Sequence, residues 1–185
     1  MKRWKQMIHV SEVLTDEPER FKSELNRRIY LAFEQLDIPF ERVENDETLT
    51  MEDCLAIDER LGVKTAKTLF LCNRQKTNYY LFPTRGDKPF VTKDFSRALG
   101  ISRVSFASAE DLNRLMGVQP GAATILSLLL ESASDVRLVI DKEIAEAPYL
   151  CCTDGTRTGY IKLRTADVLE KLIPCTGHCY EIIEI

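Results

Sequence analysis

The chain has 185 residues, of which 44% are hydrophobic and 29% are charged, and its formal net charge at pH 7 is −4. This composition excludes a disordered chain and allows one well-packed domain. The acidic balance argues against a protein that coats nucleic acid through long backbone contacts. The N-terminus lacks the apolar stretch of a secretory signal, no apolar run is long enough to cross a bilayer, and we expect a cytoplasmic protein with reduced cysteines.

Hydrophobic periodicity predicts a mixture of helices and strands. Helices are indicated where apolar residues recur every three or four positions behind a capping pattern, and strands where short apolar runs are bounded by turn residues. The predicted segments are a helix over 16–36, a strand over 39–44, a helix over 50–62, strands over 67–72 and 78–83, a helix over 93–99, a strand over 103–106, a helix over 108–116, strands over 136–140, 149–152 and 158–163, a helix over 165–172 and a strand over 180–185.

The order of these segments bears on the fold class. The first helix is placed at Asp16 because Asp16, Pro18 and Glu19 match a helix start. Helices and strands do not alternate strictly, as they would around a parallel sheet. We therefore expect a single α+β domain with a mixed, largely antiparallel sheet flanked by helices.

The segment 117–124 is rich in residues that constrain the backbone. Gly117, Pro120 and Gly121 fix a sharp turn, and Ala122 and Ala123 keep bulk away from it. Such a loop is either a tight connection between a helix and the apolar run that follows, or a site that offers backbone N–H groups to a ligand. The residues alone leave both interpretations open.

Lys67 stands at the head of a predicted strand, on the same face as Leu69 and Leu71. A lysine in this position lies either at the solvated end of the strand or in a cleft. In a cleft, its ammonium group would suit a phosphate, a carboxylate or a developing oxyanion.

Basic residues are concentrated between positions 64 and 93. They are Lys64, Lys67, Arg74, Lys76, Arg85, Lys88 and Lys93. Scattered charges of this kind are typical of a solvated face beside strands. The alternative is a local patch that binds the end of an RNA.

The cysteines and histidines do not form a recognisable metal site. Cys151 and Cys152 are adjacent, which makes a poor chelating pair, and the usual spacing of zinc ligands is missing around His178. Neither His9 nor His178 has a spacing that identifies a nucleophilic partner. The glycines of 117–121 lie too close together for a nucleotide-binding fingerprint. We expect neither a metal nor a cofactor.

Five pieces of the chain occur in an order that is specific when taken together. They are the segment 36–40, the Thr50 helix leading into 67–71, the segment 105–108 before a helix, the segment 116–124, and Gly177-His178 before the last strand. In this order the chain resembles the prolyl-tRNA editing family, the YbaK/ProX-type aminoacyl-tRNA deacylases. The resemblance covers 21–185, the expected editing domain, and leaves 1–20 as an N-terminal extension.

The resemblance implies hydrolysis of the ester that joins a wrong amino acid to tRNA, mostly alanine on the proline tRNA. By position, Lys67 matches the lysine that holds the acceptor end and assists at the ester, and it is the candidate catalytic residue. The segments 121–124 and 150–158 match the parts that contact the aminoacyl group. The candidate substrate-binding residues are Thr68, Gly121, Ala122, Ala123, Thr124, Cys151, Gly155 and Thr156.

This activity is physically reasonable for the residues present. A proline-activating site cannot exclude the smaller alanine by size, so a second site must remove the error. A positioned water and an oxyanion stabilised by N–H groups or by Lys67 would supply much of the acceleration without a covalent nucleophile. The implied partners are tRNA, through the acceptor end of proline tRNA, and the prolyl-tRNA synthetase; neither DNA nor a membrane is expected.

The chain departs from the family pattern at three positions. Ile125 stands where many members have proline, Cys151 where they have histidine, and Gly155 where they have asparagine. The changes at Cys151 and Gly155 fall in the expected amino-acid pocket. They leave open a deacylase for serine, threonine, cysteine or a non-protein amino acid, and a non-catalytic RNA-binding relative.

Overall fold

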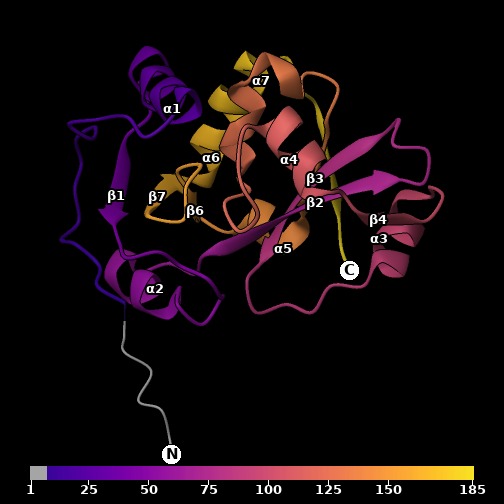
Figure 1. Ribbon diagram of the computed structural model, residues 1–185, viewed down its shortest axis with the longest axis horizontal. Coiled ribbons are helices and arrows are strands. Elements are labelled where there is room, and N and C mark those ends of the chain that lie inside the picture. The colour runs from indigo at the N-terminus through magenta and orange to yellow at the C-terminus, as the bar shows by residue number, and fades with distance from the viewer. Residues whose placement is uncertain (1–7) are drawn as a thin grey trace, which may run out of the picture.

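The computed structural model describes residues 8–185, and its strands form two sheets (Figure 1). The first is antiparallel, in the order β1-β7-β6, and consists of β1 (Phe40–Glu44), β6 (Tyr149–Thr153) and β7 (Gly159–Arg164). The second has the order β4-β2-β3-β5-β8 and consists of β2 (Ala66–Asn73), β3 (Tyr79–Arg85), β4 (Val104–Phe106), β5 (Arg137–Asp141) and β8 (Tyr180–Ile183). Only the β3–β5 and β5–β8 pairs are parallel among these strands, which confirms the predicted α+β class.

The helices are short and cover the two sheets. They are α1 (Glu24–Gln35), α2 (Leu55–Leu61), α3 (Thr92–Leu99), α4 (Ala109–Met116), α5 (Lys142–Glu146), α6 (Thr165–Asp167) and α7 (Ile173–Cys175), with the 3-10 helices η1 (Ile125–Leu129) and η2 (Glu131–Ala133) and the π-helical turn η3 (Val168–Leu172). Among residues 8–185, no helix has the length and apolar character needed to span a bilayer.

The predicted start of the first helix at Asp16 is wrong. The helix begins at Glu24, where the Ser23 side chain accepts a hydrogen bond from the Asn26 backbone N–H. Residues 8–16 run beside β1: Leu14 exchanges backbone hydrogen bonds with Arg42, and the Asp16 carbonyl accepts from the Arg42 side chain at 2.5 Å. Asp16 is therefore held at the sheet, and the capping role passes to Ser23.

Strand β2 lies between two hydrophobic cores. Its residues Ala66 and Phe70 belong to the main core beneath α1, α4 and η1, whereas Leu69 and Leu71 pack with Phe82 and Phe95 on the other face. Just before β2, Thr65 pairs with Cys151 of β6 in a parallel bridge. This bridge joins the two sheets.

Candidate functional site

Lys67 is partly buried near the start of β2, opposite Thr84 of β3. Its ammonium group donates a hydrogen bond to the backbone carbonyl of Lys88. Burial lowers the pKa of Lys67 below its ordinary value, against the opposing effect of the Asp87 carboxylate. The structure thus places Lys67 in a partly desolvated environment with a fixed hydrogen-bond acceptor.

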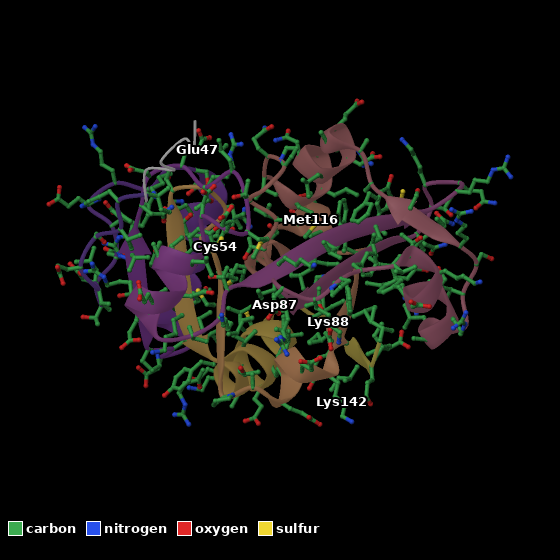
Figure 2. The ribbon with its side chains drawn as sticks, turned by 90° about the horizontal axis from the view of Figure 1, so that it is seen from below. Glu47, Cys54, Asp87, Lys88, Met116 and Lys142 are labelled. Carbon is green, nitrogen blue, oxygen red and sulfur yellow. The ribbon has the colours of Figure 1, made fainter. Side chains whose placement is uncertain are left out.

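The Lys88 carbonyl is held in place by an ion-pair network that links the loop after β3 to α5. The Lys88 ammonium lies 2.9 Å from both Asp141 Oδ2 and Glu143 Oε1. The Asp141 side chain is completely buried and also accepts a hydrogen bond from Thr84 at 2.5 Å. Although burial opposes it, hydrogen bonding to the two carboxylates raises the pKa of Lys88 and keeps it charged. Figure 2 shows Asp87 and Lys88 between the β2–β3 ribbon and Lys142 of α5.

The loop 117–124 is a tight connection between α4 and η1. Gly117 ends α4 with a φ of 66°, a left-handed conformation that favours glycine. The Ala122 N–H donates to the Gln119 carbonyl at 3.0 Å, and the Thr124 side chain caps η1 by accepting from Leu126. Ala122 and Thr124 are buried, so the loop presents only Gly121 and Ala123 among its four candidate residues.

A buried hydroxyl ties this loop to β6. Thr153 donates to the Ala122 carbonyl at 3.0 Å and accepts from the Gly155 N–H at 3.3 Å. Gly155 has a φ of 89°, a left-handed conformation that favours glycine. Thr156 donates from its N–H and its hydroxyl to Asp154, which closes the turn between β6 and β7.

The paired cysteines lie on opposite sides of β6. Cys151 packs with Cys54 and Tyr160 against α2, whereas Cys152 lies in the main core. Burial raises the pKa of Cys151 far above that of an ordinary thiol and that of Cys152 to about 12. Both are thiols at neutral pH and are unsuited to act as nucleophiles.

The candidate residues form two groups rather than one. Lys67 projects to the face of β2 that carries Leu69 and Leu71, whereas the loop 121–124 and Thr68 belong to the face of Ala66 and Phe70. In Figure 2, Met116 of the main core lies on the opposite side of the β2–β3 ribbon from Lys88. The two groups approach each other at the Thr65–Cys151 bridge. Lys67 lies two residues from Thr65 along β2, and Thr153 lies two residues from Cys151 along β6, which is about 7 Å in each case.

Several residues around Lys67 were not predicted as site residues. They are Thr84, Asp87, Lys88, Asp141 and Glu143. Lys88 is one of the basic residues concentrated between positions 64 and 93. Asp141 lies beside it because β3 pairs with β5 in parallel, and these two residues are more than fifty positions apart in the chain. The sequence carries no local signal for such a pairing.

Metal-ligating side chains do not converge in the part of the chain that the structure describes, where no group of three or more is placed to hold an ion. Within this part, His178 has a structural environment. Its ring nitrogens lie 2.7 Å from the Thr176 hydroxyl and 2.9 Å from the Ala133 carbonyl, so it fixes the turn before β8.

Comparisons with known proteins identify the family of this chain. The aminoacyl-tRNA editing domain model matches residues 45–171, a range that includes all nine candidate site residues. The chain is 24% identical over 157 residues to the prolyl-tRNA editing protein ProX of Acetoanaerobium sticklandii, covering 85% of this chain and 95% of that protein. It is 30% identical over 126 residues to the mouse (Mus musculus) prolyl-tRNA synthetase associated domain-containing protein 1, covering 67% and 74%.

A solved structure described as a candidate trans-editing enzyme for prolyl tRNA synthetase shares the fold. It superposes with a TM-score of 0.61 at 16% identity, covering 88% of this chain and 98% of the other. At this identity the likeness concerns the fold alone.

Proposed function

This chain belongs to the aminoacyl-tRNA editing family and is an aminoacyl-tRNA deacylase, and we propose that it removes alanine from mischarged proline tRNA. The names of two relatives refer to prolyl-tRNA editing or to the prolyl-tRNA synthetase, which supports proline tRNA as the substrate. Alanine is the expected error, because it is small enough to enter a site built for proline. The proposal implies a protein that acts in the cytoplasm beside the prolyl-tRNA synthetase.

The observation that carries the proposal is the environment of Lys67. Its ammonium is partly desolvated and is held by the Lys88 carbonyl, so little reorganisation is needed when charge develops nearby. Water attacks the ester carbonyl, the bond to the ribose oxygen breaks, and a proton passes to that oxygen. We assign to Lys67 the stabilisation of the intermediate oxyanion.

The second group of residues is proposed to contact the amino acid. Gly121 and Ala123 have exposed surface in the glycine-led loop, while Ala122 and Thr124 are buried beneath it. The Thr153 hydroxyl fixes the loop by its hydrogen bond to the Ala122 carbonyl. Small, fixed residues at this position suit a pocket that admits alanine and rejects larger groups.

Selectivity among charged tRNAs tests this proposal. Proline tRNA charged in turn with alanine, proline and serine is incubated with the protein, and loss of each amino acid is followed against buffer. We expect alanine to be removed fastest and proline to be spared. Faster loss of serine would replace alanine by another small amino acid as the target. No loss above the buffer rate from any of the three would contradict the proposal.

A further inference from the structure

Three basic residues without a carboxylate partner lie at one end of the five-stranded sheet. Most lysines and arginines in residues 8–185 form ion pairs; those that form none are Arg20, Lys67, Arg74, Lys93, Arg103 and Arg164. Arg74 follows β2, Lys93 lies in the first turn of α3, and Arg103 precedes β4. Figure 1 shows α3 and β4 together at the far end of the β2–β3 hairpin. In a chain with a net charge of −4, this concentration of unpaired positive charge favours an anionic partner.

A hollow of about 770 Å³ lies between these elements. Arg74, Arg103 and the hydroxyl residues Thr92, Ser102 and Ser105 line it, together with Phe106, whose exposed fraction is 58%. Strand β4 is the outer strand of its sheet, and its Val104 N–H donates to the Ser96 hydroxyl of α3 at 3.2 Å. Guanidinium groups, hydroxyls and an exposed ring are the groups that bind the phosphates and bases of single-stranded RNA.

The aromatic side of this surface continues toward Lys67. Phe106 pairs with Leu71, which shares its face of β2 with Lys67, so that Phe106 and Lys67 project from the same side of the sheet. Phe90 is partly exposed and contacts both Phe106 and Phe82, at ring-centroid distances of 5.8 Å each. Phe82 is in turn the cross-strand partner of Leu69.

The length of this path fits a short single strand. Lys67 and Leu71 are four residues apart along β2, or about 13 Å. Stacked nucleotides rise about 3.4 Å each, so the path spans about four of them. A tRNA ends in a short single-stranded segment that carries the amino acid.

We propose that the surface from Lys67 across Phe90 and Phe106 to Arg74, Lys93 and Arg103 binds the acceptor end of the tRNA. The bases of the single-stranded end stack on Phe90 and Phe106, and the basic residues hold phosphates where the paired stem begins. The proposal rests on the proposed function, because it places the reactive ester at Lys67.

Binding of uncharged proline tRNA, measured by fluorescence anisotropy from 50 to 200 mM salt, tests the surface without requiring catalysis. The double variant Arg74→Glu/Arg103→Glu is compared with Arg20→Glu/Arg164→Glu, which changes the net charge equally at exposed, unpaired arginines outside the surface. We expect the first variant to weaken binding at least tenfold and to reduce the salt slope by about 1 to 2, and the second to retain most of the affinity. Phe106→Ala should weaken binding on the order of tenfold.

A kinetic comparison separates this surface from the proposed function. With Ala-tRNA(Pro), the Arg74→Glu/Arg103→Glu variant should raise KM with little change in kcat, and with 3′-O-alanyl adenosine it should match the wild type. If the wild type hydrolyses neither substrate, the proposed function fails, and the binding data still decide the surface.

Three results would overturn the proposal of the RNA surface. One is an unchanged tRNA affinity in the Arg74→Glu/Arg103→Glu variant. Another is equal weakening by both double variants, which would show that only net charge matters. The third is a sedimentation result in which the wild type is a dimer and this variant is a monomer, while both bind tRNA with the same affinity. The edge of β4 would then be an interface between copies of the chain.

Discussion

Partial burial of the charged Lys67 ammonium group lowers the stability of the folded protein. Burial lowers the pKa of this group, so the unfolded chain holds this proton more tightly than the folded protein. This destabilising contribution has its full size at low pH, where Lys67 is protonated in both states. It becomes smaller as the pH rises through the pKa of Lys67 in the folded protein. A retained penalty of this kind is typical of functional residues. Replacement by methionine should therefore not lower Tm.

The charge on Lys67 also predicts the pH dependence of the reaction. If the ammonium stabilises the oxyanion, the enzyme-dependent rate should fall as the pH rises through a value below 10.5, the ordinary lysine pKa. The measurement is kcat for Ala-tRNA(Pro) against pH, with the buffer rate subtracted at each point. A rate that rises through this range would indicate that neutral Lys67 acts as a base and would contradict the assigned role.

The cysteines provide a second prediction at the level of residues. Cys54, Cys72, Cys151 and Cys152 are buried, whereas Cys175 and Cys179 are exposed. Because the thiolate is the reactive form and burial raises the pKa of Cys152 to about 12, native protein treated with iodoacetamide at pH 8 should be labelled only at Cys175 and Cys179. Mass spectrometry gives the sites, with denatured protein as the fully labelled control. Rapid labelling of Cys151 would show that the end of β6 is open and reactive.

Among the elements, the loop 117–124 depends on one hydroxyl from β6. Thr153→Val would remove the donor to the Ala122 carbonyl and leave a buried acceptor unpaired, which costs about 1–3 kcal/mol. We expect a lower Tm and slower deacylation, since the loop would no longer be fixed. Thr153→Ser, which keeps the hydroxyl, should retain most of both properties. A larger loss in Thr153→Ser than in Thr153→Val would indicate that the methyl group, rather than the hydrogen bond, holds the loop.

The junction of β5 and α5 supports the other half of the site. Asp141→Asn should destabilise the protein by about 3 kcal/mol, because it breaks a buried ion pair and leaves Lys88 with only Glu143. Glu143 is 43% exposed, so Glu143→Gln should cost less than about 1 kcal/mol although it contacts the same ammonium. Thermal unfolding measures the destabilisation of both variants, since Tm falls by roughly 2–4 °C for each kcal/mol lost in a chain of this size. Similar decreases of Tm in the two variants would contradict the claim that the buried Asp141 carboxylate contributes more stability than the exposed Glu143.

Local signals were sufficient for most elements. Ser108 caps α4 and Gly117 ends it as predicted, and the hairpin of β2 and β3 follows from its two apolar runs. The start of α1 was placed too early because Asp16 and Pro18 match a helix start equally well, and only the pairing of 8–16 with β1 decides between them. The five-residue helix α5 was not predicted, because it is too short for a periodic pattern.

For the whole molecule, the division of the strands into two sheets had no sequence signal. The sheets meet through the Thr65–Cys151 bridge, which joins segments more than eighty residues apart. The resemblance to the editing family supplied Lys67 and the loop 121–124 as separate pieces. Their placement on different faces of β2, and the Lys88–Asp141 network behind Lys67, depend on tertiary contacts that no local pattern encodes.

The central claim, that this fold brings Lys67 to the ester of a mischarged proline tRNA, is tested most directly by the rate of alanine release from Ala-tRNA(Pro). Wild type is compared with Lys67→Ala and with Lys64→Ala, which removes a lysine of the same segment whose side chain is 72% exposed. The account predicts release well above the buffer rate for wild type and Lys64→Ala, and a loss of about 100-fold or more for Lys67→Ala without a lower Tm. Full activity in Lys67→Ala would contradict it.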